Sequence, residues 1–398
     1  MSNRDWIARG DEVLMQTYSR FPAVMVKGEG CRLWDADGKE YLDFLSGIAV
    51  CALGHCHPRV TEAIRLQAGE LVHVSNLFYT QPQIRLADLL IANSFADRVF
   101  FANSGAEANE AAIKLARIHS GPGKFEIISL AGSFHGRTLA TVAATGQPRF
   151  HQGFEPLPQG FVHAEFGDIA AIEALVSPRT CAILCEPLQG ESGVRPLTND
   201  YLHQIRTLCD RHQLLLIFDE VQTGLGRTGS LFAHEQLGVT PDIMTLAKAL
   251  GNGLPLGAML AKEEIAVSLV PGTHASTFGG NPVATAAAVE VLETILEPGF
   301  LQTVQKNGTY FANQLTELCR QFPRWATGVR GRGLLLGLLL SEEGISLGGE
   351  IVQRMFQQGV IINFAGNKVL RFAPPLIVKK VDIDAVCAQL AKTLASLP

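Results

Sequence analysis

The sequence predicts an α/β fold: a mostly parallel central sheet with helices on both faces, joined to a smaller α+β domain. Short continuous apolar runs recur through the middle of the chain, and helical patterns separate them. Such runs are typical of strands that are buried on both faces of a parallel sheet. The two ends of the chain follow other patterns, which is why a second domain is expected.

The elements follow in chain order. A hairpin is expected at residues 33–44, turning at Asp37-Gly38. Strands are expected at 98–102, 126–130, 181–186, 214–218, 242–246 and 256–261, with helices such as 106–119 and 198–212 between them. After about residue 285, helical patterns at 283–296 and 300–321 lead into a segment punctuated by Gly331, Gly333 and Pro374-Pro375. We therefore expect a large domain at 61–285 and a small domain built from 1–60 and 286–398.

Composition narrows the function class. The chain has 398 residues, of which 47% are hydrophobic and 18% charged, and its formal net charge is −5. This balance argues against a nucleic-acid or anionic-membrane partner. No apolar run approaches the roughly 20 residues of a membrane span, since the longest, at 334–340, has the length of a strand. The charged N-terminal segment does not resemble a secretory signal, so a cytoplasmic enzyme is expected.

The eight cysteines do not form a metal or disulfide pattern. There is no CxxC pair, and reduced, mostly buried thiols are expected. The run His55-Cys56-His57 is the only metal-like cluster in the sequence. Adjacent ligands point in divergent directions, so no metal is expected there.

Lys248 and Asp219 carry the strongest chemical signal. A lone lysine is usually a solvated surface charge. Lys248, however, follows one apolar run and Asp219 ends another, 29 residues upstream. An amine and a carboxylate so placed suggest a Schiff-base lysine with an electron-sink partner, which is the chemistry of pyridoxal phosphate (PLP). Asp219 would pair with the pyridine nitrogen and keep it protonated.

The segment after the strand at 98–102 is a candidate phosphate site. Ser104 and Glu107 match an S-x-x-E capping box at a helix that begins near Ala106. Gly105 would let the backbone approach a ligand, and the free N–H groups of the helix start would hold a phosphate. Taken alone, this pattern is more often an ordinary helix cap.

Residues 224–229, GLGRTG, match the dinucleotide fingerprint and must be weighed against this hypothesis. In a dinucleotide fold the glycines directly follow the first strand. Here five residues, 219 to 223, intervene and several strands come earlier. A nicotinamide-dependent oxidoreductase is therefore the less favoured alternative.

Other side chains could complete a site. Phe134 could stack on a flat ring, and Arg137 could bind a carboxylate in bidentate fashion. Thr277, in a loop rich in hydroxyls, could add a phosphate contact. Arg371 lies among apolar neighbours and needs an anionic partner, either a substrate carboxylate or Glu191.

Together these motifs resemble the class III (subgroup II) PLP-dependent aminotransferases, over a stretch from about Tyr18 to Pro375. The resemblance is carried by SGAEANEAAIKLAR, SFHGRT, EPLQGE, FDEVQTGLGRTG, LAKALGNGLPLGA and STFGGNP. It implies fold type I, a homodimer and active sites shared between subunits.

The resemblance also implies roles for single residues. Lys248 would be the Schiff-base lysine and the base of the proton shift, with Asp219 at the pyridine nitrogen. The remaining cofactor contacts would be Ser104, Gly105, Ala106, Phe134, Val221, Gln222 and, from the neighbouring subunit, Thr277. The substrate contacts would be Arg137, Arg371, Glu191, Tyr18, Asn76 and Ser276.

Residues 42–58 and 72–83 resemble the family members that act on N²-acetylornithine. This implies transfer of the δ-amino group to 2-oxoglutarate, as in arginine biosynthesis. Gly47 and Ile48 would leave room for an acylated amine where enzymes acting on ornithine carry a tyrosine. Cys51 departs from the asparagine expected at its position.

One arginine, Arg137, could bind the distal carboxylate of both substrates. Arg371 would bind the second carboxylate of glutamate, and Glu191 would pair with Arg371 when the other substrate is bound. Ornithine, 4-aminobutyrate, succinylornithine and succinyl-diaminopimelate are the alternative amine substrates. An isomerase of the glutamate-semialdehyde mutase type, which would not need Arg371, and a catalytically silent binding protein are the less favoured alternatives.

Overall fold

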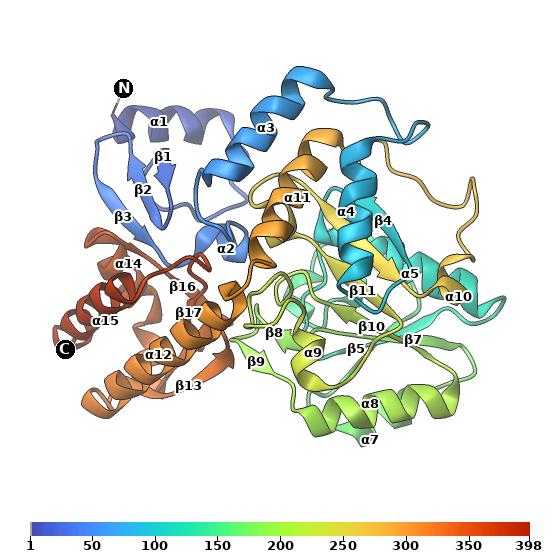
Figure 1. The fold of residues 1–398 in the computed structure, drawn as a ribbon. Coiled ribbons are helices and arrows are strands. Elements are labelled where there is room, and N and C mark those ends of the chain that lie inside the picture. Colours follow the sequence, from blue (N-terminus) through green and yellow to red (C-terminus); the bar gives the residue numbers. More distant parts are fainter. Residues whose placement is uncertain (1) are drawn as a thin grey trace.

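Seven strands form the central sheet of the computed structural model, which describes residues 2–398 (Figure 1). Their order is β4 (Arg98–Ala102), β12 (Gly257–Ala261), β11 (Ile243–Leu246), β10 (Leu215–Asp219), β7 (Thr180–Cys185), β5 (Glu126–Leu130) and β6 (Phe161–Ala164). Only β12 runs against its two neighbours, and the other adjacent pairs are parallel. The expected mostly parallel α/β sheet is confirmed.

Alternate side chains of these strands face opposite layers of helices. On one face, Ile127 and Ile217 pack against the alanine-rich side of α5 (Gly105–Ser120), beside α6 (Leu139–Ala144) and α10 (Glu263–Ala266). On the other face, Ile128 and Phe218 pack against α8 (Asn199–His212), with α7 (Ile169–Leu175) and α9 (Ala233–Leu237). Both faces are therefore dry, which explains why the strands are continuous apolar runs.

Three helices cover the β4–β12–β11 end of the sheet. α11 (Pro282–Ile295) packs against both α3 (Pro58–Glu70) and α4 (Gln81–Ala92), although α11 comes some 200 residues later in the chain (Figure 1). Short 3₁₀ turns lie at η1 (Pro148–Phe150) and η2 (Lys248–Gly251). A two-stranded ribbon, β8 (Leu188–Gln189) with β9 (Arg195–Pro196), lies after β7.

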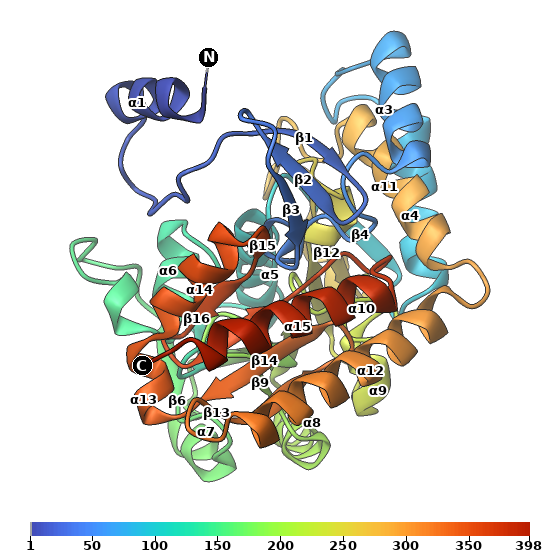
Figure 2. The same ribbon diagram turned by 90° about the vertical axis from the view of Figure 1, so that its left-hand side faces the viewer.

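The two ends of the chain share a second region. β1 (Met25–Glu29), β2 (Arg32–Asp35) and β3 (Glu40–Asp43) form a sheet whose fourth strand is β15 (Val360–Ile361). An antiparallel sheet of β13 (Ala326–Arg332), β14 (Leu335–Leu340), β17 (Val369–Phe372) and β16 (Asn363–Ala365) lies under α12 (Phe300–Gln321) and α15 (Lys380–Ala395) (Figure 2). The remaining helices are α1 (Asn3–Val13), the turn α2 (Ser46–Ala49), α13 (Glu342–Ser346) and α14 (Gly348–Gln357).

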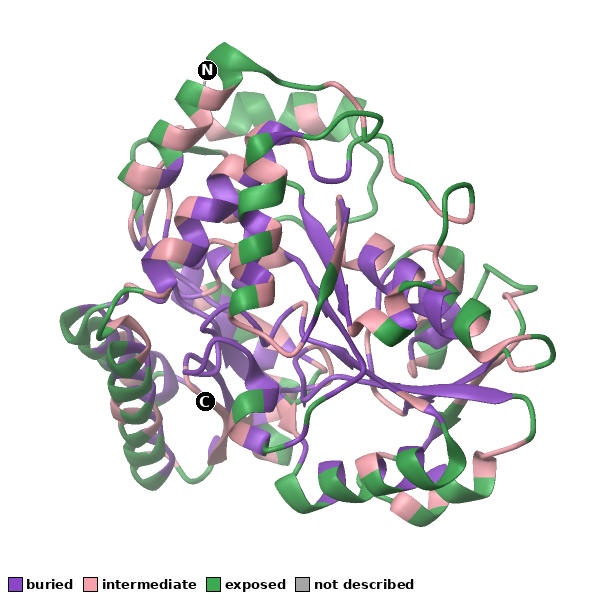
Figure 3. Cartoon of the chain, turned by 45° about the vertical axis from the view of Figure 1, so that its right-hand side comes forward, coloured by how far each residue is buried: buried purple, intermediate pink, exposed green. Residues whose placement is uncertain are grey.

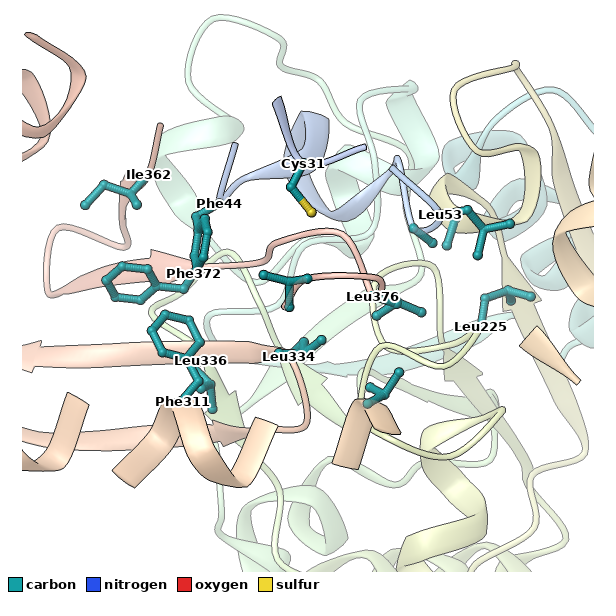
Figure 4. Packing of buried hydrophobic residues seen from close by; sticks show 14 of the residues in the cluster. Cys31, Phe44, Leu53, Leu225, Phe311, Leu334, Leu336, Ile362, Phe372 and Leu376 are labelled. Atoms are coloured by element: carbon teal, nitrogen blue, oxygen red, sulfur yellow. The ribbon is translucent and has the colours of Figure 1, made fainter. Parts of the chain in front are cut away.

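One apolar core joins this region to the central sheet. Phe311 of α12 makes edge-to-face contacts with Phe44 and with Phe372 of β17 (Figure 4). The same cluster continues to Leu53 and to Leu246 of the central sheet. The inner strands of the central sheet are buried, whereas the outer faces of the surrounding helices are exposed (Figure 3). The large and small regions thus pack on each other through continuous apolar surface.

Candidate active site

A cavity of about 420 Å³ lies where the parallel strands of the central sheet end. Because β4, β5, β7, β10 and β11 all run in one direction, the residues that follow them meet at a single edge. Ten of the residues expected at the site line this cavity: Ser104, Gly105, Ala106, Phe134, Arg137, Glu191, Asp219, Val221, Gln222 and Lys248. Sequence positions from 104 to 248 are thereby brought together.

Asp219 ends β10 as a buried carboxylate with three hydrogen-bond partners. Its Oδ2 accepts hydrogen bonds from Asn109 Nδ2 at 2.8 Å and pairs with His135 Nδ1 at 2.8 Å, and its Oδ1 accepts from the Val221 N–H at 3.1 Å. Asn109 is in turn held by Thr245 of the neighbouring strand at 2.7 Å. Only 4% of the surface of Asp219 is exposed. Its hydrogen bonds fix the carboxylate in place and offset the free-energy cost of burying it.

Lys248 follows β11, the neighbour of β10, and reaches the same cavity. Within residues 2–398 its amine has no hydrogen-bond partner, and its backbone holds a φ of 45°. Burial lowers the pKa of Lys248, and the charge of Arg371 adds to that effect. A larger fraction of the amine is therefore neutral at a given pH, as a nucleophile and proton acceptor requires.

The start of α5 forms a concave surface of N–H groups. Ser104 Oγ accepts from the Glu107 N–H at 3.2 Å, while the first N–H groups of the helix, at Gly105 and Ala106, have no intrahelical acceptor. A Cβ on Gly105 would lie 2.7 Å from a methyl of Val221, so only glycine fits here. The expected capping box is only half formed, because Glu107 Oε2 accepts from the Asn103 N–H at 2.6 Å instead of from Ser104.

Glu186, which follows β7, lies inside the cavity beside Phe134. Its Oε1 accepts from the Phe134 N–H at 2.8 Å. Burial, followed by the charge of Asp219, raises the pKa of Glu186 well above its ordinary value. Arg137 stacks on Phe150, with 4.1 Å between its guanidinium carbon and the ring centre, and also lies over Phe134 at 5.5 Å. Its guanidinium pairs with no carboxylate within residues 2–398.

Arg371 and Glu191 form an ion pair at the cavity. Arg371 Nη1 lies 2.6 Å from Glu191 Oε1, and Gln222 Nε2 donates to the same oxygen at 3.0 Å. Burial opposes ionisation of Glu191, but Arg371 and Lys248 outweigh it and lower the pKa of this carboxyl to about 2. The pair is therefore fully charged at neutral pH. Arg371 is 1% exposed, and its Nη2 has no hydrogen-bond partner within residues 2–398.

Four of the expected residues lie outside the cavity of a single chain. Asn76 and Thr277 line a separate small pocket, in which Asn76 donates to the carbonyl oxygens of Ser276 and Gly279 at 2.9 Å. Ser276 Oγ accepts from Asn103 Nδ2 at 3.3 Å. Tyr18 is 72% exposed. One chain does not bring these side chains to Lys248.

Several residues of the cavity were not expected from sequence. Glu186, Asn109 and His135 contact its main groups, and Val50 forms part of its wall. The strand-end rule that selected Asp219 applies equally to Glu186, which directly follows β7. Val50 carries no such signal, because an apolar residue in a loop is indistinguishable from ordinary core. Ile48, expected at the substrate pocket, does not line this cavity.

The glycines of 224–229 are packed against other parts of the chain. A Cβ on Gly226 would lie 3.0 Å from Leu376, and one on Gly229 would lie 2.8 Å from Gln305. Arg227 between them is fully buried and donates to the carbonyl oxygens of Leu334 and Pro374. These glycines serve close packing, which leaves no room for a dinucleotide.

Residues 2–398 contain no cluster of three His, Cys, Asp or Glu side chains with the geometry of a metal site. No helix among them is both long and apolar enough to cross a membrane.

The cavity fits PLP on the evidence of its own residues. The buried Asp219 is placed to meet a pyridine nitrogen, the N–H groups at Gly105 and Ala106 can hold a phosphate, and Lys248 supplies an amine. The aromatic Phe134 and the methyl groups of Val221 provide apolar walls for a flat ring.

Comparisons with known proteins agree with this geometry. A family model described as aminotransferase class-III matches residues 14–394. A protein of Myxococcus xanthus named acetylornithine aminotransferase is 51% identical over 376 residues, which cover 93% of each chain. The structure of an ornithine aminotransferase from Toxoplasma gondii has a TM-score of 0.95 at 33% identity, covering 100% of this chain and 96% of that one. The structure of an N-acetylornithine aminotransferase from Stenotrophomonas maltophilia has a TM-score of 0.84 at 37% identity, covering 98% of both chains.

Proposed function

The chain belongs to the class III aminotransferases, and we propose that it transfers the δ-amino group of N²-acetylornithine to 2-oxoglutarate in arginine biosynthesis. The products are N-acetylglutamate 5-semialdehyde and glutamate. Enzymes of this class depend on PLP, which accepts the amino group of the donor and serves as the electron sink when the neighbouring carbon loses its proton.

Two residues hold the chemistry in place. Lys248 Nζ would hold and move the proton of the donor carbon, and its lowered pKa makes the neutral amine available. Asp219, held by Asn109 and His135, would keep the pyridine nitrogen of the cofactor protonated. The apolar walls at Val221 and Phe134 exclude water from the reacting atoms.

The two arginines of the site differ in their partners, and this difference supports the choice of substrates. Arg137 faces the cavity without a carboxylate partner, whereas Arg371 is already neutralised by Glu191 at 2.6 Å. N²-acetylornithine has one carboxylate, which suits Arg137 alone. Glutamate and 2-oxoglutarate have two, and Glu191 must release Arg371 so that Arg371 can bind the second. The charged Glu191–Arg371 pair is the observation that carries the proposal of two alternating substrates.

A homodimer with shared active sites belongs to the proposal. Leu77, Phe78, Tyr79 and Phe278 are 86%, 66%, 92% and 61% exposed, which is far more apolar surface than a single loop region ordinarily leaves in water. Thr277 lies beside this surface and outside the cavity of its own chain. A second copy would cover the surface and bring Thr277 to the partner's cofactor. A cytoplasmic location and the absence of nucleic-acid and membrane partners remain predictions from composition.

Steady-state kinetics test the proposal. With 2-oxoglutarate as acceptor, kcat/KM should be highest for N²-acetylornithine among acetylornithine, ornithine, succinylornithine, succinyl-diaminopimelate and 4-aminobutyrate. Lys248→Ala should lower kcat by about 10²–10⁴-fold or more, because both the amine nucleophile and the base are removed. Lys306→Ala, an exposed lysine of α12, is the matched control and should leave kcat unchanged. Turnover by Lys248→Ala at the wild-type rate would contradict the assigned chemistry, and preference for another amine would contradict the substrate.

A further inference from the structure

Residues 43–55, here named the clamped loop, leave β3 through an unusual left-handed turn. The φ angles of Ser46, Gly47, Ile48 and Ala49 are 47°, 66°, 68° and 61°. Only one of the four is glycine, and a β-branched residue such as Ile48 rarely adopts this conformation. A run of this kind persists only where the surrounding structure over-determines it, which is common beside functional sites.

A buried carboxylate fixes both ends of the clamped loop. Asp43 Oδ1 accepts from the N–H groups of Leu45 at 2.9 Å and Ser46 at 2.7 Å. Asp43 Oδ2 pairs at 2.7 Å with Nε2 of His55, at the far end of the loop. Burial opposes protonation of His55, but hydrogen bonds to Asp43 and Cys51 outweigh it and raise the pKa of His55 to about 10. The pair is charged at neutral pH.

Further hydrogen bonds connect the clamped loop to the segment that follows Arg371 and to the turn that begins at Lys248. Ser46 Oγ donates to the Ala373 carbonyl at 2.6 Å, two residues after Arg371. At the other end, Leu53 N–H donates at 2.8 Å to the side chain of Asn252, which ends the turn that begins at Lys248. Phe44 and Leu53 anchor the two ends in the core (Figure 4).

Val50 is the residue that this arrangement presents to the cavity. Its N–H donates to the Ser46 carbonyl at 2.9 Å, so the left-handed turn determines where its side chain lies. Val50 lines the cavity, and so do the apolar side chains of Leu188, Leu254 and Leu256; we refer to these four side chains as the apolar wall. The neutral amide of an acylated diamino acid loses little against such a wall, whereas a free ammonium there loses its hydration.

We propose that the Asp43–His55 pair is a positioning device that holds the left-handed turn, so that Val50 completes an apolar wall selecting the acylated amine over the free diamino acid. This inference rests on the proposed function and adds a determinant of its specificity. Asp43 and His55 act through Val50 and do not themselves touch the reacting atoms.

The test compares His55→Gln and Val50→Ala with wild type in the full-length, PLP-loaded enzyme. We expect each variant to lower the ratio of kcat/KM for N²-acetylornithine to that for ornithine by about tenfold, the scale of one or two methylene contacts in an apolar pocket. The loss should fall mainly on KM for acetylornithine, with kcat changed by less than about threefold, because binding and not chemistry is affected. The double variant should lose no more than the larger single loss, since both changes act through one wall.

His57→Gln is the matched control. It makes the same substitution two positions along, and His57 forms no ion pair within residues 2–398, so its selectivity ratio should equal that of wild type. Val50→Ala leaves the Asp43–His55 pair intact and keeps the test decisive if His55→Gln folds poorly. A ratio unchanged in Val50→Ala, or losses that simply add in the double variant, would overturn the inference. Wild-type enzyme that prefers ornithine would instead overturn the proposed substrate, and the inference with it.

Discussion

Glu186 is a carboxyl group buried in the cavity, where it contacts the Phe134 backbone. Burial and the charge of Asp219 raise the pKa of Glu186 well above its ordinary value, which favours the neutral acid, and its Oε1 accepts a hydrogen bond from the Phe134 N–H. Glu186→Gln should therefore keep kcat within about threefold of wild type. Glu186→Ala should lower the free energy of unfolding by about 1–3 kcal/mol, because it leaves a buried N–H without a partner. Thermal or urea unfolding and steady-state assays measure both, and equal damage by the two substitutions would contradict a neutral Glu186.

Substitution of Arg371 should affect the KM of only one of the two substrates, unlike substitution of Arg137, although both arginines belong to one site. Arg371→Lys removes the planar fork that pairs with a carboxylate, at a cost of about 1.5–3 kcal/mol for a charge-assisted bond. We expect KM for 2-oxoglutarate to rise about 10–100-fold and KM for N²-acetylornithine by less than about threefold. Arg330→Lys, whose Nε donates to the Gly193 carbonyl, is the control. Both KM values rising equally would show that Arg371 binds a carboxylate of both substrates.

For the strands and helices, the local sequence pattern was sufficient to predict an element wherever both faces of the sheet are buried. The expected strands and helices named above end within one residue of those observed, because continuous apolar runs and 3.6-residue periodicity are direct consequences of packing. The left-handed turn at 46–49 was not predictable, since only Gly47 favours positive φ and the contacts that impose it come from Ala373 and His55. Long-range hydrogen bonds of this kind leave no local pattern.

The clamped loop should also have a distinct pH signature. The pKa of His55 is raised from its ordinary value of 6.5 to about 10, so its stabilising contribution is complete below about pH 6.5 and is lost as pH rises through about 10. The melting temperature of wild type minus that of His55→Gln should therefore be largest near pH 6 and shrink toward zero above pH 10. Differential scanning calorimetry across this range measures the difference. A difference that grows with pH would contradict a charged Asp43–His55 pair.

At the scale of the whole molecule, the sequence predicted the α/β architecture and the residues that follow its strands. It did not separate the residues that one chain brings together from Tyr18, Asn76, Ser276 and Thr277, which lie outside the cavity of a single chain. The N-terminal strands pair with β15 and the C-terminal strands form their own sheet, and one core crosses to the central sheet. The division at residues 61–285 stays a prediction.

The exposed apolar surface at Leu77, Phe78 and Tyr79 predicts an assembly of two chains. Light scattering should give a mass twice the 42.9 kDa of one chain. Phe78→Asp should shift the mass toward one chain and weaken cofactor retention, because a charge is placed in the apolar contact and Thr277 no longer reaches the partner's cavity. Val381 on α15 is as exposed as Phe78, so Val381→Asp is the control and should change neither the mass nor the cofactor retention. A wild-type mass of one chain, with full activity, would contradict shared active sites.

The most direct measurement is the absorbance spectrum of the purified, PLP-loaded enzyme as each amine is added separately without any oxo acid. We expect N²-acetylornithine to convert the visible band of the lysine-bound cofactor to the band of its amine form at a lower concentration than ornithine or 4-aminobutyrate does. Conversion at the lowest concentration by another amine would keep the aminotransferase chemistry and contradict the substrate. The absence of a visible cofactor band, even after PLP is added, would contradict the roles assigned to Lys248 and Asp219.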